Sequence, residues 1–322
     1  MEAFRSVTHP LLSLEDAATL YLSGPADAPH MLFFLAGYPS DHSCFAPLAS
    51  RLALQCGCLV GVSCMPEYDR ESPLRKEGYN MDEMSECVRQ AIGALRSTST
   101  HPSPLLTLVL HDWGVMPGLI YANTNICHKV VVFDVLPSKK PDSVMTGLLH
   151  IHYQSLFAIT FAIHRVSALL ANLWLILVLF YFALLRPLLN PIGPRTDGRK
   201  RNPFSSVGYF PWQTPDKEMS GSVKMTPYRC YPYYYMLKGV LLGKMEEVMQ
   251  KLSVIKCISR QPVCYIYGEE KNTQFHCQDL LSKLRETEGC EVVGVPKAGH
   301  WCYKHEPELC FTVVERFVFG AK

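Results

Sequence analysis

An aspartate stands where the chain is expected to turn from a strand into a helix. Residues 105–110 are mostly aliphatic and β-branched, which predicts a buried strand, and a helix is expected over 114–123. Asp112 therefore lies at a sharp turn at the carboxyl end of a sheet, beside the unpaired N–H groups of the new helix. A carboxylate in this position suits nucleophilic attack on carbon. The alternative is a helix N-cap, for which aspartate is also favoured.

Two other segments supply groups that would complement this aspartate. Residues 31–35 predict a second buried strand, and the Gly/Pro break at 36–40 follows it, where backbone N–H groups can turn toward a ligand. Residues 291–296 predict a late strand, after which Gly299 and His300 follow. The chain thus offers, in order, hydrogen-bond donors, an acidic nucleophile and a histidine base.

The segment His111-Asp112-Trp113-Gly114, with this loop and this histidine, resembles the Asp-nucleophile branch of the α/β-hydrolase superfamily, the epoxide hydrolases and haloalkane dehalogenases. The resemblance covers residues 31–137 and 262–319. It implies an α/β-hydrolase fold, a mostly parallel and doubly wound sheet with an inserted, hydrophobic helical lid.

The resemblance also implies a division of the chain. Residues 1–137 would form the first part of the core, residues 138–259 the inserted lid, and residues 260–322 the second part of the core. Strands are expected at 17–23, 31–35, 57–64, 105–110, 129–134, 262–267 and 291–295.

Two helices of the core are expected from their apolar spacing. Residues 82–96 carry apolar side chains at helical intervals, and Pro307 can open a final helix whose Leu309, Val313, Val314 and Phe317 would face the sheet.

The same resemblance implies a two-step hydrolysis. Asp112 would attack an electrophilic carbon and form an ester with the enzyme, and His300 would activate the water that hydrolyses this ester. The backbone N–H groups of Tyr38 and Trp113 would stabilise the ester oxygen. The loop of this branch normally begins with histidine, whereas Ala36 stands here.

A histidine base needs a carboxylate to orient it, and two positions compete for that role. Asp134 lies at the end of the expected strand at 129–134, which matches the sixth strand of this branch and is one of the two places that the branch uses. At the other place, three residues after Gly268, the chain has Lys271, and Glu270 lies one position away. Asp134 and Glu270 are both candidates, and spacing alone favours Asp134.

The electrophile would depend on the lid. Epoxide hydrolases donate protons from two lid tyrosines, and residues 228–235 contain a tyrosine-rich run from which Tyr234 is our candidate. Dehalogenases bind the halide with N–H donors, one of them on the tryptophan after the nucleophile, here Trp113. We expect a small hydrophobic, lipid-like epoxide, with a haloalkane or a lipid ester as alternatives.

The residues around the elbow also bear on two other function classes. A serine esterase is disfavoured, because the elbow lacks the Gly-x-Ser-x-Gly pattern. A catalytically silent, membrane-associated binding protein remains an alternative, because Ala36 and the bulky Leu110 and Val115 depart from the expected pattern around the elbow.

Within the expected lid, residues 166–185 form an apolar run between Arg165 and Arg186 that is long enough to span a bilayer. A single-pass arrangement would, however, place Asp112 and His300 on opposite sides of the membrane. We therefore expect a lid helix that dips into one leaflet of a membrane or forms a hydrophobic substrate mouth, and a single-pass membrane protein is the alternative. A basic patch that could rest on anionic headgroups follows this apolar run, formed by Arg195, Arg199, Lys200 and Arg201.

Composition restricts the remaining possibilities. The chain has 322 residues, 48% of them hydrophobic, which is enough for one large core, and its net charge of +2 gives no reason to expect a nucleic-acid partner. Its 13 cysteines are scattered, many in apolar runs, and Cys56 and Cys58 have the wrong spacing for zinc. We expect reduced thiols, no metal and no cofactor. Because residues 1–6 lack a secretory pattern, a cytoplasmic location is expected.

Overall fold

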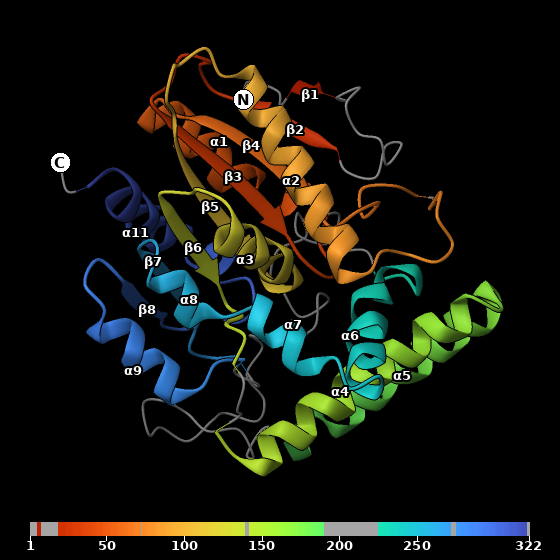
Figure 1. Ribbon diagram of the computed structural model, residues 1–322. Coiled ribbons are helices and arrows are strands. Elements are labelled where there is room, and N and C mark those ends of the chain that lie inside the picture. The colour runs from red at the N-terminus through yellow and green to blue at the C-terminus, as the bar shows by residue number, and fades with distance from the viewer. Residues whose placement is uncertain are drawn as a thin grey trace.

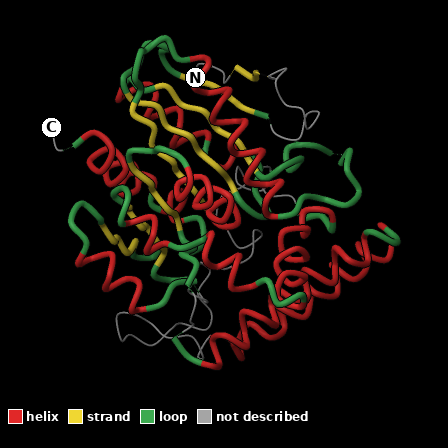
Figure 2. Tube along the Cα trace, in the orientation of Figure 1, coloured by secondary structure: helices red, strands yellow, loops and turns green. Residues whose placement is uncertain are grey.

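The computed structural model describes residues 5–7, 19–71, 73–138, 142–189, 225–271 and 275–320. Its strands form one sheet, whose order is β1-β2-β4-β3-β5-β6-β7-β8 (Figures 1 and 2). The first two strands run antiparallel to their neighbours, and the others are parallel. The strands are β1 (Arg5–Val7), β2 (Leu20–Ser23), β3 (His30–Ala36), β4 (Leu59–Cys64), β5 (Leu105–His111), β6 (Lys129–Phe133), β7 (Val263–Gly268) and β8 (Glu291–Val295).

Helices cover both faces of the sheet because the central strands are buried throughout. Every described residue of β4 and β7 is buried, as a parallel strand between two helical layers requires. Helices α1 (Ala46–Cys56) and α11 (Pro307–Phe319) pack on one face, mainly in one core cluster. The other cluster contains apolar residues of α2 (Met81–Thr98), α3 (Val115–Thr124) and α9 (Gln278–Glu286).

Helix α2 illustrates how the sequence determines an element. Asn80 accepts hydrogen bonds from the backbone N–H groups of Asp82 and Glu83, and Glu83 bonds back to the Asn80 N–H, which forms a capping box. The apolar stripe of the helix, Met84, Val88, Ala91, Ile92 and Leu95, is buried as expected.

The final helix departs in one residue from the expected pattern. It begins at Pro307, and Val313, Val314 and Phe317 are buried. The expectation for Leu309 is wrong, since this side chain lies in the first turn and is partly exposed. No disulfide joins the described cysteines; Cys58, Cys64 and Cys264 are buried, whereas Cys56 and Cys290 are only half-buried.

The described part of the segment between β6 and β7 is mainly helical and lies over the carboxyl edge of the sheet, where an inserted helical lid was expected. Helices α4 (Val144–His164) and α5 (Ala168–Leu189) lie side by side as a hairpin, and α6 (Tyr231–Leu241) packs against α4 and also contacts α2 (Figure 1). The short helices α7 (Met245–Lys251) and α8 (Val254–Ile258) follow. Helix α8 already belongs to the sheet core, because Val254 and Cys257 are buried there.

The apolar run predicted at 166–185 forms α5, but the helix begins two residues later. The Ser167 hydroxyl accepts a hydrogen bond from the Leu170 N–H at the start of α5, so Val166 belongs to the turn after α4. Within the part of the chain that the structure describes, no helix combines the length and the apolarity needed to cross a membrane. The basic patch at 195–201 lies outside the described residues.

Candidate active site

Asp112 occupies a strained turn between β5 and α3. Its φ of 52° lies in the left-handed region, which a residue other than glycine rarely adopts. Gly114 permits this turn, because a Cβ there would lie 2.6 Å from the Leu35 carbonyl oxygen. The bulky Leu110, two residues before Asp112, is accommodated by Gly118 on α3, where a Cβ would meet the leucine side chain at 2.4 Å. The elbow therefore forms despite Leu110.

The Asp112 carboxylate is buried yet incompletely bonded. The Trp113 backbone N–H donates to it, while its Oδ1 has no hydrogen-bond partner among the described residues. Burial raises the pKa of Asp112, an effect that nearby His300 opposes. An unpartnered carboxylate oxygen at a strained turn is suited to bond formation rather than to capping.

His300 lies between Asp112 and Asp134. Its Nε2 is 3.5 Å from Asp112 Oδ2, and its Nδ1 is 2.5 Å from Asp134 Oδ2. Asp134 follows β6 directly and has a φ of 68°, so its side chain points across the strand ends toward the histidine loop. The structure thus brings together an acid, a base and a second acid in the geometry of a catalytic triad.

The second acid is Asp134, because this is the carboxylate that meets His300 Nδ1. Glu270 lies at the end of β7, and its backbone N–H donates to the Ala298 carbonyl. Burial alone would raise the pKa of Asp134, but Lys271 and His300 outweigh it and lower that pKa to about 2. Asp134 is therefore ionised at neutral pH beside the histidine.

His111 connects the elbow to the histidine loop, a role that the sequence did not suggest. Its Nε2 lies 3.2 Å from the His300 carbonyl oxygen, and the Tyr303 hydroxyl lies 3.4 Å from its Nδ1. Burial, reinforced by His300, holds the pKa of His111 well below its usual range. The neutral ring can donate through Nε2 and accept from tyrosine through Nδ1.

The loop after β3 lies directly against the elbow. A Cβ on Gly37 would lie 2.3 Å from the Trp113 nitrogen, so only glycine allows this approach. The neighbouring Tyr38 is buried, and its ring packs edge-on against Phe157 of α4 and Tyr233 of α6. The loop therefore joins the elbow to the inserted helices.

Two adjoining cavities lead to Asp112. A small one of about 40 Å³ has Asp112 and Tyr153 in its wall, and a larger one of about 320 Å³ extends to Ile151 on α4 and Met249 on α7. Both are lined by Trp113, Met116, Val135, Gln154 and Phe275. The walls are mainly apolar, which suits a hydrophobic ligand.

Two tyrosines line the small cavity together with Asp112. Tyr153 of α4 and Tyr233 of α6 both line it, and their hydroxyl oxygens are 2.8 Å apart. Tyr234, the candidate from the sequence, lies elsewhere, since its hydroxyl accepts from Arg165 in a separate groove. Tyr153 lies outside the tyrosine-rich run, so no local motif distinguished it.

The remaining tyrosines of that run anchor the insertion to the core. The Tyr228 hydroxyl donates to the buried Glu67 at 2.6 Å, and the Tyr231 hydroxyl donates to the Pro66 carbonyl at 3.1 Å. Arg229 is buried and donates to the carbonyls of Pro39 and Tyr68. These contacts fix α6, and with it Tyr233, over the elbow.

His111, Asp134 and His300 also lie close enough for their ligand atoms to be within 4.8 Å of one another. These atoms are already engaged, because His300 Nδ1 bonds to Asp134 and His111 bonds to the His300 carbonyl. The buried ammonium of Lys271 contacts Asp134 Oδ2 and would repel a cation there. The cluster fits a catalytic triad better than a metal site.

Comparison with known proteins identifies the fold. No protein-family model and no curated protein matches the chain. Among solved structures, a haloalkane dehalogenase variant from Agrobacterium tumefaciens is similar with a TM-score of 0.61 and 14% identity, over 99% of this chain and 98% of that one. A haloalkane dehalogenase from Bradyrhizobium elkani gives 0.60 and 14%, with 98% of each chain covered.

An epoxide hydrolase is similar with a TM-score of 0.57 and 14% identity, over 97% of this chain and 98% of that one. The strand order, the elbow after β5 and the histidine after β8 agree with these likenesses. The chain therefore has the α/β-hydrolase fold that the sequence predicted.

Proposed function

We propose that this protein is a hydrolase that forms a covalent ester on Asp112. One observation carries the proposal: a buried aspartate with an unpartnered oxygen lies at the cavity end, 3.5 Å from a histidine that a second carboxylate orients. An aspartate that served only as a cap would require neither His300 nor a cavity.

The chemistry follows from these positions. Asp112 Oδ1 attacks an electrophilic carbon, a bond forms between that carbon and the aspartate oxygen, and the electron pair of the breaking bond goes to the leaving atom. His300 Nε2 then takes a proton from a water molecule, which attacks the ester carbonyl carbon. Asp134 stabilises the protonated histidine. When the ester bond breaks, the departing substrate oxygen takes the proton from His300 and leaves as the alcohol, and the Asp112 carboxylate and neutral His300 are regenerated.

An epoxide is the electrophile that the cavity supports best. Opening the ring places negative charge on oxygen, and this oxygen requires a proton donor on the side opposite Asp112. Tyr153 and Tyr233, which line the same small cavity as Asp112, carry two paired hydroxyls that could supply this proton. Their mutual hydrogen bond allows one tyrosine to hold the other in position while it donates.

A haloalkane is the second candidate. Trp113 lines both cavities next to Asp112, which is where an N–H donor for a halide is required. Two of the similar structures are described as haloalkane dehalogenases. A halide leaves without a proton, however, so this reaction gives no role to the two tyrosine hydroxyls.

We further propose that the substrate is lipid-like and that the α4–α5 hairpin rests on a membrane surface. Between residues 143 and 189 the only charged side chains are Arg165 and Arg186, so no carboxylate opposes anionic headgroups. The hairpin surface consists of exposed apolar residues: Val144, Leu148, Ile151, Ile159, Val166, Leu169, Leu170, Leu173, Ile176, Leu177, Phe180 and Leu184.

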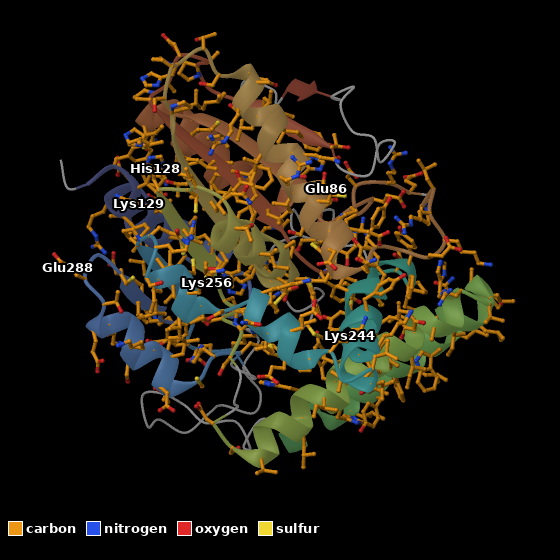
Figure 3. The ribbon with its side chains drawn as sticks, in the orientation of Figure 1. Glu86, His128, Lys129, Lys244, Lys256 and Glu288 are labelled. Atoms are coloured by element: carbon orange, nitrogen blue, oxygen red, sulfur yellow. The ribbon has the colours of Figure 1, made fainter. Side chains whose placement is uncertain are left out.

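Two features connect this hairpin surface with catalysis. An exposed apolar face of this extent is typical of a lipid or partner contact. Ile151 belongs both to this exposed hairpin surface and to the wall of the larger cavity, so an apolar molecule could pass from the surface into the cavity. Charged residues such as Glu86, Lys244 and Lys256 lie on α2, before α7 and on α8 instead (Figure 3).

The proposed reaction is tested with paired substrates. Purified protein is incubated with a terminal alkyl epoxide and with the 1-bromoalkane of equal length, and the diol or alcohol formed is measured. We expect diol formation that Asp112→Asn abolishes and that Asp82→Asn, an exposed control on α2, leaves unchanged. Alcohol from the bromoalkane alone would favour the dehalogenase. Turnover of neither substrate, across chain lengths, would contradict the proposal.

The membrane contact is tested by sedimentation with phosphatidylcholine vesicles, with and without phosphatidylserine. We expect the wild-type protein to sediment with the vesicles and Leu173→Glu/Leu177→Glu to remain in the supernatant. Leu54→Glu is the matched control, because Leu54 is 63% exposed, as Leu177 is 60%, but lies on α1. Equal sedimentation of the three proteins would contradict the contact.

A further inference from the structure

Lys271 is a buried cation inside the catalytic cluster. Its side chain is inaccessible to solvent, and its ammonium contacts Asp134 Oδ2, the same oxygen that meets His300 Nδ1. Burying a lysine is costly unless a partner compensates its charge. The lysine is therefore part of the site and not a surface residue that happens to point inward.

The fold brings Lys271 to this position through the strand ends. Strands β6 and β7 are parallel neighbours, and the Asp134 N–H donates to the Ile266 carbonyl, so the residues that follow the two strands meet. The lysine Nζ also lies 4.4 Å from the centre of the Phe275 ring, a cation–π distance. Phe275 lines both cavities, so the lysine is held between the substrate space and the triad.

A second cation on Asp134 changes what this carboxylate does for the histidine. A lone buried carboxylate strongly stabilises a protonated imidazole, which then keeps its proton and is a poor base. Here the ammonium neutralises the carboxylate from the other side. Asp134 can still orient the ring through the hydrogen bond to Nδ1, while its net attraction for a proton on His300 is reduced.

We infer that Lys271 is a positioning residue that keeps His300 unprotonated, and so active as a base, down to lower pH than Asp134 alone would allow. The inference deepens the proposed function and rests on it for the catalytic role of His300. The ion pair itself is independent of any substrate.

The other charged and titratable groups near His300 do not supply this effect. Asp112, at the elbow, is the negative group on the Nε2 side. His111 at the end of β5 and His305 of α10 (Cys302–His305) have pKa values lowered by burial, so they are neutral. Lys304 and Glu306, which also lie after β8, are opposite charges close together in sequence.

The first test measures how His300 titrates, with no substrate present. Nitrogen NMR of the imidazole is followed against pH in the wild type, Lys271→Gln and Lys271→Arg. We expect the titration of Lys271→Gln to move upward by about one pH unit, the lower end of what one nearby charge produces. Lys271→Arg, which keeps the charge, should titrate near the wild type. An unchanged titration in folded Lys271→Gln would overturn the inference.

A second pair of variants keeps the test informative if Lys271→Gln does not fold. Asp134→Asn is compared with Asp134→Asn/Lys271→Met, in which the lysine charge is removed together with its partner. In the double variant no lysine ammonium repels a protonated imidazole, so His300 should titrate at higher pH than in Asp134→Asn. Equal titration of these two proteins would also overturn the inference.

The catalytic consequence is read separately, as the pH dependence of ester hydrolysis in a single turnover. Its acid limb should move upward in Lys271→Gln and return in Lys271→Arg. Because the NMR titration requires no turnover, a protein that titrates as expected but lacks epoxide hydrolysis would refute the proposed reaction and leave the lysine assignment intact.

Discussion

Replacing Asp134 by asparagine removes the charge that orients and stabilises His300 while keeping the size of the side chain. The histidine loses the carboxylate that lies 2.5 Å from Nδ1, and the amide can present its N–H₂ group there and favour the wrong tautomer. Loss of the triad acid in serine hydrolases lowers turnover about 10⁴-fold, and we expect a similar loss here.

The same variant changes stability in a way that depends on pH. A pKa of about 2, against an ordinary 3.8, means that the ionised Asp134 stabilises the fold by about 2 kcal/mol at neutral pH. This contribution is fully present above pH 3.8 and is lost as the pH falls toward 2. The variant also leaves the buried Lys271 ammonium without its carboxylate, which costs about 3–5 kcal/mol when a buried pair is broken.

The assay combines turnover of the epoxide with urea unfolding at pH 7 and pH 3. Asp134→Asn should be strongly impaired and destabilised at pH 7, with a smaller difference in stability at pH 3. Glu270→Gln is the matched control, because Glu270 is the other carboxylate considered from the sequence. Impairment of Glu270→Gln with near-normal activity of Asp134→Asn would refute the assignment of Asp134 as the triad acid.

Three further outcomes follow from the geometry. Tyr153→Phe and Tyr233→Phe should each lower the rate of epoxide opening about 10²-fold or more and leave the rate of bromoalkane displacement unchanged. Both rates are measured in parallel, and equal effects on the two reactions would show that the hydroxyls have only a structural role. Because burial raises the pKa of Asp112, its charge destabilises the fold above the unfolded-state pKa. Asp112→Asn should therefore raise the melting temperature at pH 7 but not at pH 3, and a lower melting temperature at pH 7 would contradict this. Gly37→Ala should remove activity even if folded, since its methyl group would displace the Trp113 amide; normal turnover would show that the loop can move away.

The sheet was predictable because its strands are buried on both faces. The runs around Phe34, Val109 and Val131 are mostly apolar, a pattern typical of central parallel strands. Boundaries were less well determined. Residues 57 and 58 were assigned to β4, but Gly57 ends α1 in the left-handed conformation, which apolar content does not reveal.

The residues of the candidate site also fall into those that the sequence predicted and those that it did not. Asp112 and His300 follow parallel strands, β5 and β8, so both lie at the carboxyl edge of the sheet, and the loop after β8 brings them together. The tyrosines did not follow from topology, because α4 and α6 pack through tertiary contacts that no local period encodes. Tyr153 faces the cavity since Phe157, one turn later, is buried on the same side of α4, and Arg229 fixes the rotation of α6. Lys271 looked like a departure from the expected acid, and only the structure places it on Asp134.

The most direct measurement of the central claim is mass spectrometry of the His300→Gln protein after incubation with a lipid-like epoxide. Formation of the ester on Asp112 requires no base, whereas its hydrolysis does, so the adduct should accumulate and map to the peptide that contains Asp112. The wild type should show little adduct, and Asp112→Asn/His300→Gln should show none. A folded His300→Gln protein that remains unmodified while the wild type hydrolyses the same epoxide would contradict covalent catalysis by Asp112.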